Sequence, residues 1–217
     1  MVKKINSVQC IHRKLVSLHL YLIKNMANKP LDTTLLDRAI TFAVRAHAGT
    51  ERRGKAFPYI VHPMEAVEIV ATMTNDQELL AAAILHDTVE DTDVTIEQIR
   101  AEFGNRVASF VAIESDEPHQ SRDSIENWRA RKQAAMDRLA SASRDAKIVA
   151  LGDKLSNMRA IARDYTVQGD RLWNIFHSTN PQDHEWHYRG LAASLRELQD
   201  TFAYKEFEQL INQVFSH

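Results

Sequence analysis

The 217-residue sequence has few of the residues that break regular structure, with six glycines and five prolines. This scarcity disfavours a β fold full of tight turns and disfavours disorder. The single cysteine, Cys10, excludes an internal disulfide framework and a cysteine-based zinc site. The longest apolar run of the main body, Leu79 to Leu85, is far shorter than the roughly 20 residues that cross a bilayer. A net charge of −2 gives no reason to expect nucleic-acid binding.

Charge is unevenly distributed along the chain. Residues 1–25 hold five basic residues and no acidic residue, whereas the rest of the sequence holds 22 basic against 29 acidic residues. We therefore expect residues 1–25 to be a dispensable basic extension and residues 26–217, which begin at Met26, to form one domain. A basic amphipathic helix that binds a partner or a membrane surface is the alternative for residues 1–25.

The spacing of apolar residues predicts an all-α fold. Apolar residues recur at helical spacing, and no run alternates convincingly between apolar and polar residues. Pro63 suits a first helical turn, Thr95 and Gln98 form a capping box, and Gly104 ends the short helix that follows that box. The expected helices are 33–48, 63–74, 76–90, 95–103, 105–115, 124–141, 144–162, 168–177, 181–201 and 205–215. The centre of helix 76–90 is apolar all round, which predicts burial on every side.

Ionisable residues follow the most apolar of these segments. His86 and Asp87 come directly after Leu85, and Glu90 and Asp91 lie one turn later on the same helix. A core histidine beside a capping carboxylate is the simpler interpretation, but three carboxylates on one buried helix would repel one another. A divalent cation would relieve this repulsion, because carboxylates and neutral imidazole are natural ligands of such ions.

Two further ionisable residues lie in apolar surroundings. His62 follows Tyr59-Ile60-Val61, and Asp153 lies inside the apolar segment 149–155, with Asn157 one turn later on the same face. Taken singly, His62 would be read as a helix cap and Asp153 as the partner of a nearby Lys or Arg. Taken together, they complete a coordination sphere. The predicted cation ligands are His62, His86, Asp87 and Asp153.

These motifs resemble those of a known family. The order His62, His86-Asp87, Asp153 is similar to the H…HD…D signature of the HD-domain metal-dependent phosphohydrolases. Within that superfamily, three segments resemble the basic loop, the HDTVEDT segment and the DKLxNxR segment of the RelA/SpoT-type hydrolase domain, as in the stand-alone small alarmone hydrolases. These segments are RRGKAFPYIVHP (52–63), ILHDTVEDT (84–92) and LGDKLSNMR (151–159).

The resemblance implies a compact all-α HD-domain bundle around one metal ion, usually manganese, held by the four ligands above. It implies that Glu90 and Asp91 position and deprotonate an attacking water. The implied reaction removes pyrophosphate from the 3′ position of guanosine tetra- or pentaphosphate, giving GDP or GTP, in a cytoplasmic enzyme whose partner is this nucleotide.

The resemblance also implies the substrate contacts. Arg53 and Lys55 would receive the nucleotide, with Arg52 as the alternative within the basic loop, and Asn157 would contact the ribose. The positive charges of Arg52, Arg53 and Lys55 would offset the repulsion between a polyanionic substrate and the acidic residues of the site. The sequence departs from the family pattern at Thr50, Gly152 and Ala160, where Gln, Ala and Thr are common.

Several alternatives remain open at this stage. A mixed nitrogen and oxygen ligand set admits manganese, iron, cobalt or zinc. The alternatives to the implied reaction are hydrolysis of an adenosine alarmone, hydrolysis of the 2′-phosphate of NADPH, and binding of alarmones without catalysis. Neither a nucleic acid nor a membrane is expected as a partner, and the sequence gives no oligomeric state.

Other chemically active residues are given structural roles. His47 is expected to pack against the basic loop. A solvated basic face is expected for Trp128, Arg129, Arg131 and Lys132, with a phosphate contact as the alternative. Core and surface packing is expected for His184, Trp186, His187 and Tyr188, although one aromatic ring could flank the base. Ion pairs with acidic neighbours are expected for Lys154 and Arg159.

Overall fold

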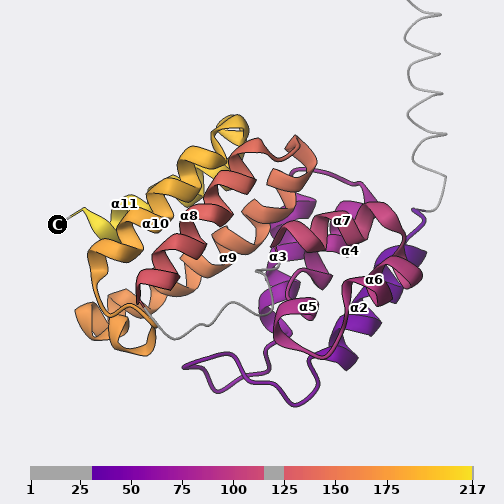
Figure 1. Ribbon diagram of the computed structural model, residues 1–217, viewed down its shortest axis with the longest axis horizontal. Coiled ribbons are helices and arrows are strands. Elements are labelled where there is room, and N and C mark those ends of the chain that lie inside the picture. The colour runs from indigo at the N-terminus through magenta and orange to yellow at the C-terminus, as the bar shows by residue number, and fades with distance from the viewer. Residues whose placement is uncertain (1–30, 115–124, 217) are drawn as a thin grey trace, which may run out of the picture. The chain divides into compact units, whose positions relative to one another are not determined.

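Helices make up the regular structure of the computed structural model, which describes residues 31–114 and 125–216 (Figure 1). Residues Thr34–His217 cluster as one unit. The proposed extension 1–25 lies outside the described residues. The α-helices are α2 (Thr34–Ala46), α3 (Val61–Ala71), α4 (Gln77–Leu85), α5 (Thr88–Asp91), α6 (Ile96–Phe103), α7 (Asn105–Glu114), α8 (Ile125–Ser141), α9 (Arg144–Gln168), α10 (Pro181–Ser194) and α11 (Phe202–Phe215). Two 3-10 helices, η1 (Gly169–Ile175) and η2 (Arg196–Leu198), complete the set. Within the described ranges, the β-structure is one isolated antiparallel bridge, Glu51–Pro58, so the all-α prediction is confirmed.

Helix α4 lies at the centre of the first half of the fold. Every residue from Leu79 to Leu85 is buried, as the all-round apolar pattern predicted. The helix packs against α2, α3, α7 and α9. Its first turn is capped by Asp76, whose side chain accepts a hydrogen bond from the Glu78 amide at 2.9 Å. A helix packed on several sides provides a fixed platform for the residues that follow it.

Helix α4 ends at Leu85 and a separate helix, α5, begins at Thr88, so the prediction of one helix over 76–90 is wrong. Two side chains bond carbonyl groups near the end of α4. His86 Nδ1 lies 2.8 Å from the Ala83 carbonyl, and Thr88 Oγ1 donates to the Leu85 carbonyl at 2.7 Å. Such local bonds offer the backbone an alternative to continuing the helix. The short helix α5 then begins, and the Asp91 amide bonds the Asp87 carbonyl at 2.9 Å.

Helix α9 is the longest helix among the described residues and packs most extensively against α3. Ser143 caps its start, and the helix extends to Gln168, beyond the expected end at 162, before Gly169 adopts a φ of 55°. The two helices approach closely at Gly152. A Cβ atom there would lie 2.6 Å from Val70 Cγ2 and 2.9 Å from the Ala66 carbonyl oxygen. Glycine is therefore required for this separation of α3 and α9.

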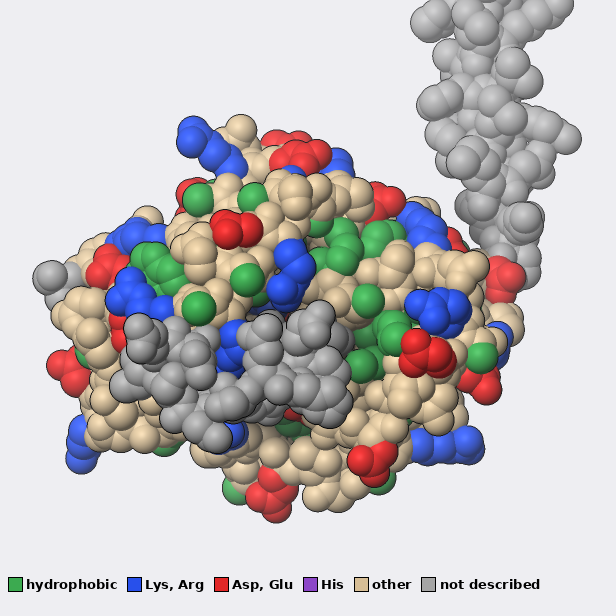
Figure 2. All heavy atoms as spheres, viewed as in Figure 1, with side chains coloured by type: hydrophobic (Ala, Val, Ile, Leu, Met, Phe, Trp, Pro, Cys, Tyr) green, Lys and Arg blue, Asp and Glu red, His purple; other side chains and the backbone are tan. Residues whose placement is uncertain are grey.

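The C-terminal helices form the second half of the fold. Helices α8, α10 and α11 group on one side of α9, opposite α2 and α4–α7 (Figure 1). Three predicted boundaries differ: 168–177 is the 3-10 helix η1, α10 ends at Ser194 before η2, and α11 begins at Phe202 after a Thr201 cap. Acidic and basic side chains are interspersed over the face shown in Figure 2. Among the described residues, no helix has the length and apolar character needed to span a membrane.

Candidate metal centre and active site

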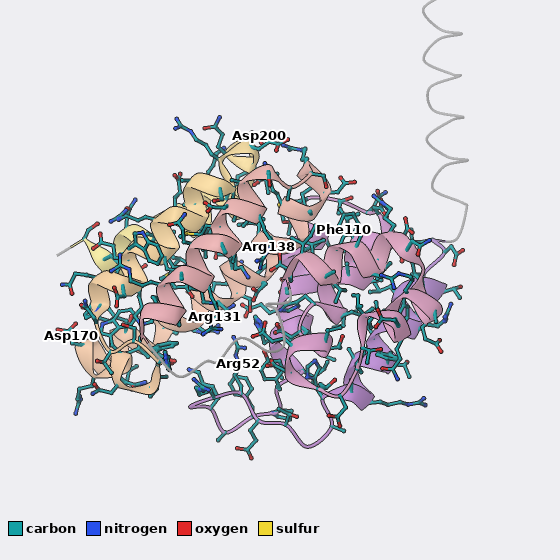
Figure 3. All side chains as sticks on the ribbon, in the orientation of Figure 1. Arg52, Phe110, Arg131, Arg138, Asp170 and Asp200 are labelled. Atoms are coloured by element: carbon teal, nitrogen blue, oxygen red, sulfur yellow. The ribbon has the colours of Figure 1, made fainter. Side chains whose placement is uncertain are left out.

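A cavity of about 380 Å³ lies where the two halves of the fold meet around α9. One wall comes from the loop before α3, from α5 and from α9, and the opposite wall comes from α8, from the segment that follows η1 and from α10. Arg52 extends from the loop between α2 and α3 toward the helices (Figure 3). Most of the residues that the sequence motifs single out therefore line one cavity that is open to solvent on one side.

Two imidazoles and two carboxylates converge at the inner end of this cavity. His62 Nε2 lies 3.0 Å from Asp153 Oδ1 and 3.4 Å from Asp87 Oδ2. His86 Nε2 lies 2.9 Å from Asp87 Oδ2 and 3.5 Å from Asp153 Oδ1. These side chains come from α3, from the α4–α5 junction and from α9, so only the folded chain assembles them. His62, His86 and Asp87 form a group that could hold a metal ion.

The histidine side chains are oriented for metal binding. His86 Nδ1 lies 2.8 Å from the Ala83 carbonyl, which can only accept a hydrogen bond, so Nδ1 carries a proton. His62 Nδ1 lies 2.8 Å from Ser156 Oγ. Both Nε2 atoms are buried and make no hydrogen bond of acceptable geometry with the described residues. Lone pairs that face carboxylates need a cation or a proton between them, so these residues fit a divalent ion.

The electrostatics of the cluster point the same way. Burial alone would raise the pKa of Asp87, but His86 and His62 hold it well below its usual range. Burial would also raise the pKa of Asp153, but Lys154 and the two histidines hold it well below its usual range. Burial would lower the pKa of His86, yet Asp87 and Asp153 raise it well above 6.5. Both carboxylates are thus ionised and attract a positive charge.

Neighbouring groups fix both carboxylates in place. Tyr59 donates its hydroxyl hydrogen to Asp87 Oδ2 at 2.6 Å. Asp153 accepts from Asn157 Nδ2 at Oδ1 and from Lys154 Nζ at Oδ2, each at 2.5 Å. Lys154 also pairs with Glu114 Oε2 at 2.9 Å, as expected from its acidic neighbours. Such outer contacts orient ligands and set their basicity.

Glu90 and Asp91 line the same cavity on α5, close to the cluster. Partial burial and the charge on Asp87 raise the pKa of the Asp91 carboxyl. A carboxylate with a raised pKa is a better proton acceptor, which suits a general base. His47 lies behind this wall, buried, with its ring centroid 5.0 Å from that of Tyr59. Its packing against the loop agrees with the sequence expectation.

The basic loop reaches the cavity with two of its three cations. Arg52 and Arg53 both line the cavity, and Arg52 Nη2 donates to Asn157 Oδ1. The Arg52 guanidinium carbon also lies 5.2 Å from the centroid of the Tyr59 ring. Lys55 is different, because its ammonium pairs with Asp164 on α9 and it does not line the cavity. Asn157 thus links the loop to Asp153, in addition to any contact with a ribose.

The opposite wall of the cavity contains residues that the sequence analysis gave structural roles. Apolar and polar side chains recur along one face each of α8 and α10. They are Trp128, Lys132, Ala135 and Leu139 from α8, and His184, His187, Tyr188 and Leu191 from α10. The α8 positions are three or four residues apart, and in α10 both His187 and Tyr188 lie three or four residues from His184 and Leu191, which is the signal that could have identified a shared face. Trp128 is buried, so the expectation that it belongs to a solvated surface is wrong, whereas Lys132 is half-buried in the cavity lining.

His187 contributes a neutral imidazole to this wall. Burial and the positive charges of Lys132 and Lys154 lower its pKa well below 6.5. Its Nδ1 atom is buried and lacks a hydrogen-bond partner among the described residues. The wall opposite the acidic cluster therefore offers the ammonium of Lys132 together with the neutral imidazole of His187.

Comparisons with known proteins give a consistent result. A family model described as HD domain matches residues 39–175. The chain is 36% identical over 135 residues to a Xenopus tropicalis protein named guanosine-3′,5′-bis(diphosphate) 3′-pyrophosphohydrolase MESH1, covering 61% of this chain and 72% of that protein. It is 42% identical over 96 residues to an Aquifex aeolicus protein named guanosine-3′,5′-bis(diphosphate) 3′-pyrophosphohydrolase. That match covers 44% of this chain and only 14% of the longer bacterial relative.

A solved structure has the same fold. A protein described as a metazoan ortholog of SpoT that hydrolyzes ppGpp superimposes with a TM-score of 0.65. Its sequence is 22% identical, and the superposition covers 86% of this chain and 97% of that one. The likeness therefore extends beyond the motif-bearing helices into the C-terminal half.

Proposed function

The chain belongs to the HD-domain family, and on this basis we propose that it is a metal-dependent 3′-pyrophosphohydrolase of guanosine tetra- and pentaphosphate. The observation that carries the proposal is the convergence of two imidazoles and two carboxylates at one point, with Glu90 and Asp91 beside them on the same cavity wall. The names of the relatives support the choice of nucleotide. The proposed substrate is an intracellular nucleotide, which implies a cytoplasmic enzyme.

We propose His62, His86, Asp87 and Asp153 as the metal ligands and manganese as the ion. Two ionised carboxylates balance the charge of a divalent ion, and the orphaned Nε2 atoms supply its nitrogen ligands. When bound, such an ion supplies Lewis acidity, which polarises a phosphoryl oxygen and lowers the pKa of water.

The acidic pair on α5 performs the proton transfer. Asp91, with its raised pKa, accepts a proton from the attacking water, and Glu90 orients that water from the next position on the cavity wall. Water adds across the bond between the ribose O3′ and phosphorus. The ribose oxygen leaves with a proton as the 3′-hydroxyl of GDP or GTP, and pyrophosphate is the second product.

Basic residues hold the polyanionic substrate in place. Arg52, Arg53 and Lys132 face the cavity from both walls and offer charge-assisted hydrogen bonds to phosphate oxygens. Asn157 would exchange its bond with Arg52 for a ribose hydroxyl, and Lys55 would reach the nucleotide after leaving Asp164. A cavity of about 380 Å³ lies within the range that holds small ligands.

A panel of nucleotides assayed with manganese tests the substrate. We expect guanosine tetraphosphate to be converted to GDP with release of pyrophosphate, and we expect the activity to disappear with a chelator and return with manganese. Release of orthophosphate alone, with guanosine tetraphosphate untouched, would refute the proposed reaction. That outcome would favour a phosphatase acting on another nucleotide, such as NADPH.

The substitution Glu90→Gln separates catalysis from binding. The variant should lose about 10²- to 10⁴-fold in kcat, because it disables a group of the proton-transfer pair, while it still binds the nucleotide. Glu97→Gln on α6 is the control, since Glu97 is exposed and lies outside the cavity. Binding of the nucleotide by the wild type without turnover would identify a non-catalytic module instead.

A further inference from the structure

A chain of hydrogen bonds leads from His62 to the opposite side of α9. His62 Nδ1 lies 2.8 Å from Ser156 Oγ, and Ser156 Oγ donates to Glu65 Oε2 at 2.7 Å. Arg159 Nη1 contacts Glu65 Oε1 at 3.3 Å, and the same guanidinium holds Glu206 of α11 through bonds of 2.7 and 2.9 Å. The chain joins α3, α9 and α11, and both His62 and Ser156 are buried.

The direction of these bonds fixes the protonation of His62. A carboxylate only accepts hydrogen bonds, so the Ser156 hydroxyl hydrogen points to Glu65. The Ser156 oxygen must then accept from His62, which places the imidazole proton on Nδ1. Arg159 Nη1 lies 3.3 Å from the other Glu65 oxygen, Oε1, and holds the carboxylate group in place. The lone pair of His62 therefore stays on Nε2, the atom that faces Asp87 and Asp153.

The two histidines of the cluster obtain this orientation in different ways. His86 uses the main-chain carbonyl of Ala83, which no side-chain substitution removes. His62 relies on the side chains of Ser156 and, behind it, Glu65. Loss of the serine hydroxyl would free His62 to carry its proton on Nε2, where it would point at the carboxylates and oppose a cation. The tautomer of His62 therefore depends on side-chain contacts, whereas the tautomer of His86 does not.

We propose that Ser156 and Glu65 are positioning residues, which hold His62 in the tautomer that binds the metal ion. This inference rests on the metal centre of the proposed function. It concerns two residues that are not themselves part of the cavity lining. Groups in this position change metal affinity by about 10- to 100-fold when removed in other metalloproteins.

The test measures binding of manganese to metal-stripped protein by calorimetry. Ser156→Ala should raise the dissociation constant about 10- to 100-fold. Ser178→Ala is the matched control, because Ser178 is also buried and donates to a carboxylate, Asp183 Oδ2 at 2.7 Å, but contacts no proposed metal ligand. It should lower thermal stability to a similar degree and leave manganese affinity unchanged.

A double-mutant cycle completes the experiment. Glu65→Ala should also weaken manganese binding, and the Ser156→Ala/Glu65→Ala double variant should bind no more weakly than Ser156→Ala alone, because both act through one chain of bonds. The inference is overturned if Ser156→Ala binds manganese within threefold of the wild type, or if the two losses add in full. A wild type that binds no divalent ion would instead refute the proposed metal centre itself.

Discussion

The close approach of α3 and α9 at Gly152 can be tested by adding a single methyl group. In Gly152→Ala the new Cβ would lie 2.9 Å from the Ala66 carbonyl oxygen and 2.6 Å from Val70 Cγ2, whereas ordinary contacts begin near 3.4 Å. The oxygen belongs to the backbone of α3, and Val70 is fully buried. The helices must therefore separate by about half an ångström or more, and that movement has a cost in stability.

The magnitude follows from two opposing effects. Overpacking a core costs about 1–3 kcal/mol, while replacing glycine by alanine inside a helix returns about 1 kcal/mol. Gly190→Ala in α10 is the matched control, since its Cβ would lie 2.2 Å from Sδ of Met136, whose flexible side chain can move, whereas a backbone atom cannot. Because the gain in helix propensity is common to both, Gly152→Ala should be less stable than Gly190→Ala by about 1–3 kcal/mol.

The same methyl group should also disturb the metal centre. Ala66 lies one turn after His62, and Asp153 is the neighbour of Gly152, so a wedge here widens the 3.0 Å gap between His62 Nε2 and Asp153 Oδ1. Manganese affinity should fall in Gly152→Ala and not in Gly190→Ala. Urea unfolding of both variants, followed by metal titration, gives the two readouts. Equal stability of the two variants would refute the argument.

Two other predictions concern charge. The raised pKa of His86 stabilises the metal-free protein fully below about pH 6.5, and this contribution is lost as the pH rises through the pKa of His86 in the folded state. Manganese must displace the proton that His86 binds. The apparent affinity for manganese should therefore increase by up to about tenfold per pH unit above 6.5. Calorimetry in buffers of different ionisation enthalpy counts the proton, and no release at pH 7 would contradict the assignment. Asp164→Asn should free Lys55 and lower the KM for the nucleotide by up to about fivefold with kcat unchanged. A higher KM in steady-state assays would mean that the ion pair holds the loop in its binding position.

The sequence was sufficient to predict the central helix and the convergence at the site. Seven consecutive apolar residues before His86-Asp87 predicted complete burial, and the structure confirms it. Burying ionisable side chains costs free energy, which indicated that His62 and Asp153 would lie close to His86 and Asp87. The distances agree with that prediction. The burial of this helix and the convergence of the ionisable residues could be predicted because both follow from the local sequence pattern and from the cost of burying charge.

Features that depend on tertiary packing were not predictable. The break between α4 and α5 arises because His86 and Thr88 bond backbone carbonyls, and helical periodicity does not report such competition. The pairing of Lys55 with Asp164 joins residues 109 positions apart. The second wall of the cavity was missed because a polar and aromatic helix face looks alike whether it meets solvent or encloses a ligand. The prediction for residues 1–25 stays a prediction.

Helix α9 fixes the spacing and the relative orientation of the site residues that it carries. It carries Asp153, Ser156, Asn157 and Asp164 as one uninterrupted rod, so their relative bearings are set by helical pitch alone. One inserted residue between Asp153 and Asp164 would turn everything beyond it by about 100° and advance it by about 1.5 Å. Asp164, which pairs with Lys55 of the basic loop, would then point away from the loop, although every residue of the proposed active site would still be present. Divergence among such proteins should therefore accumulate in connecting segments and spare the residue count of this rod.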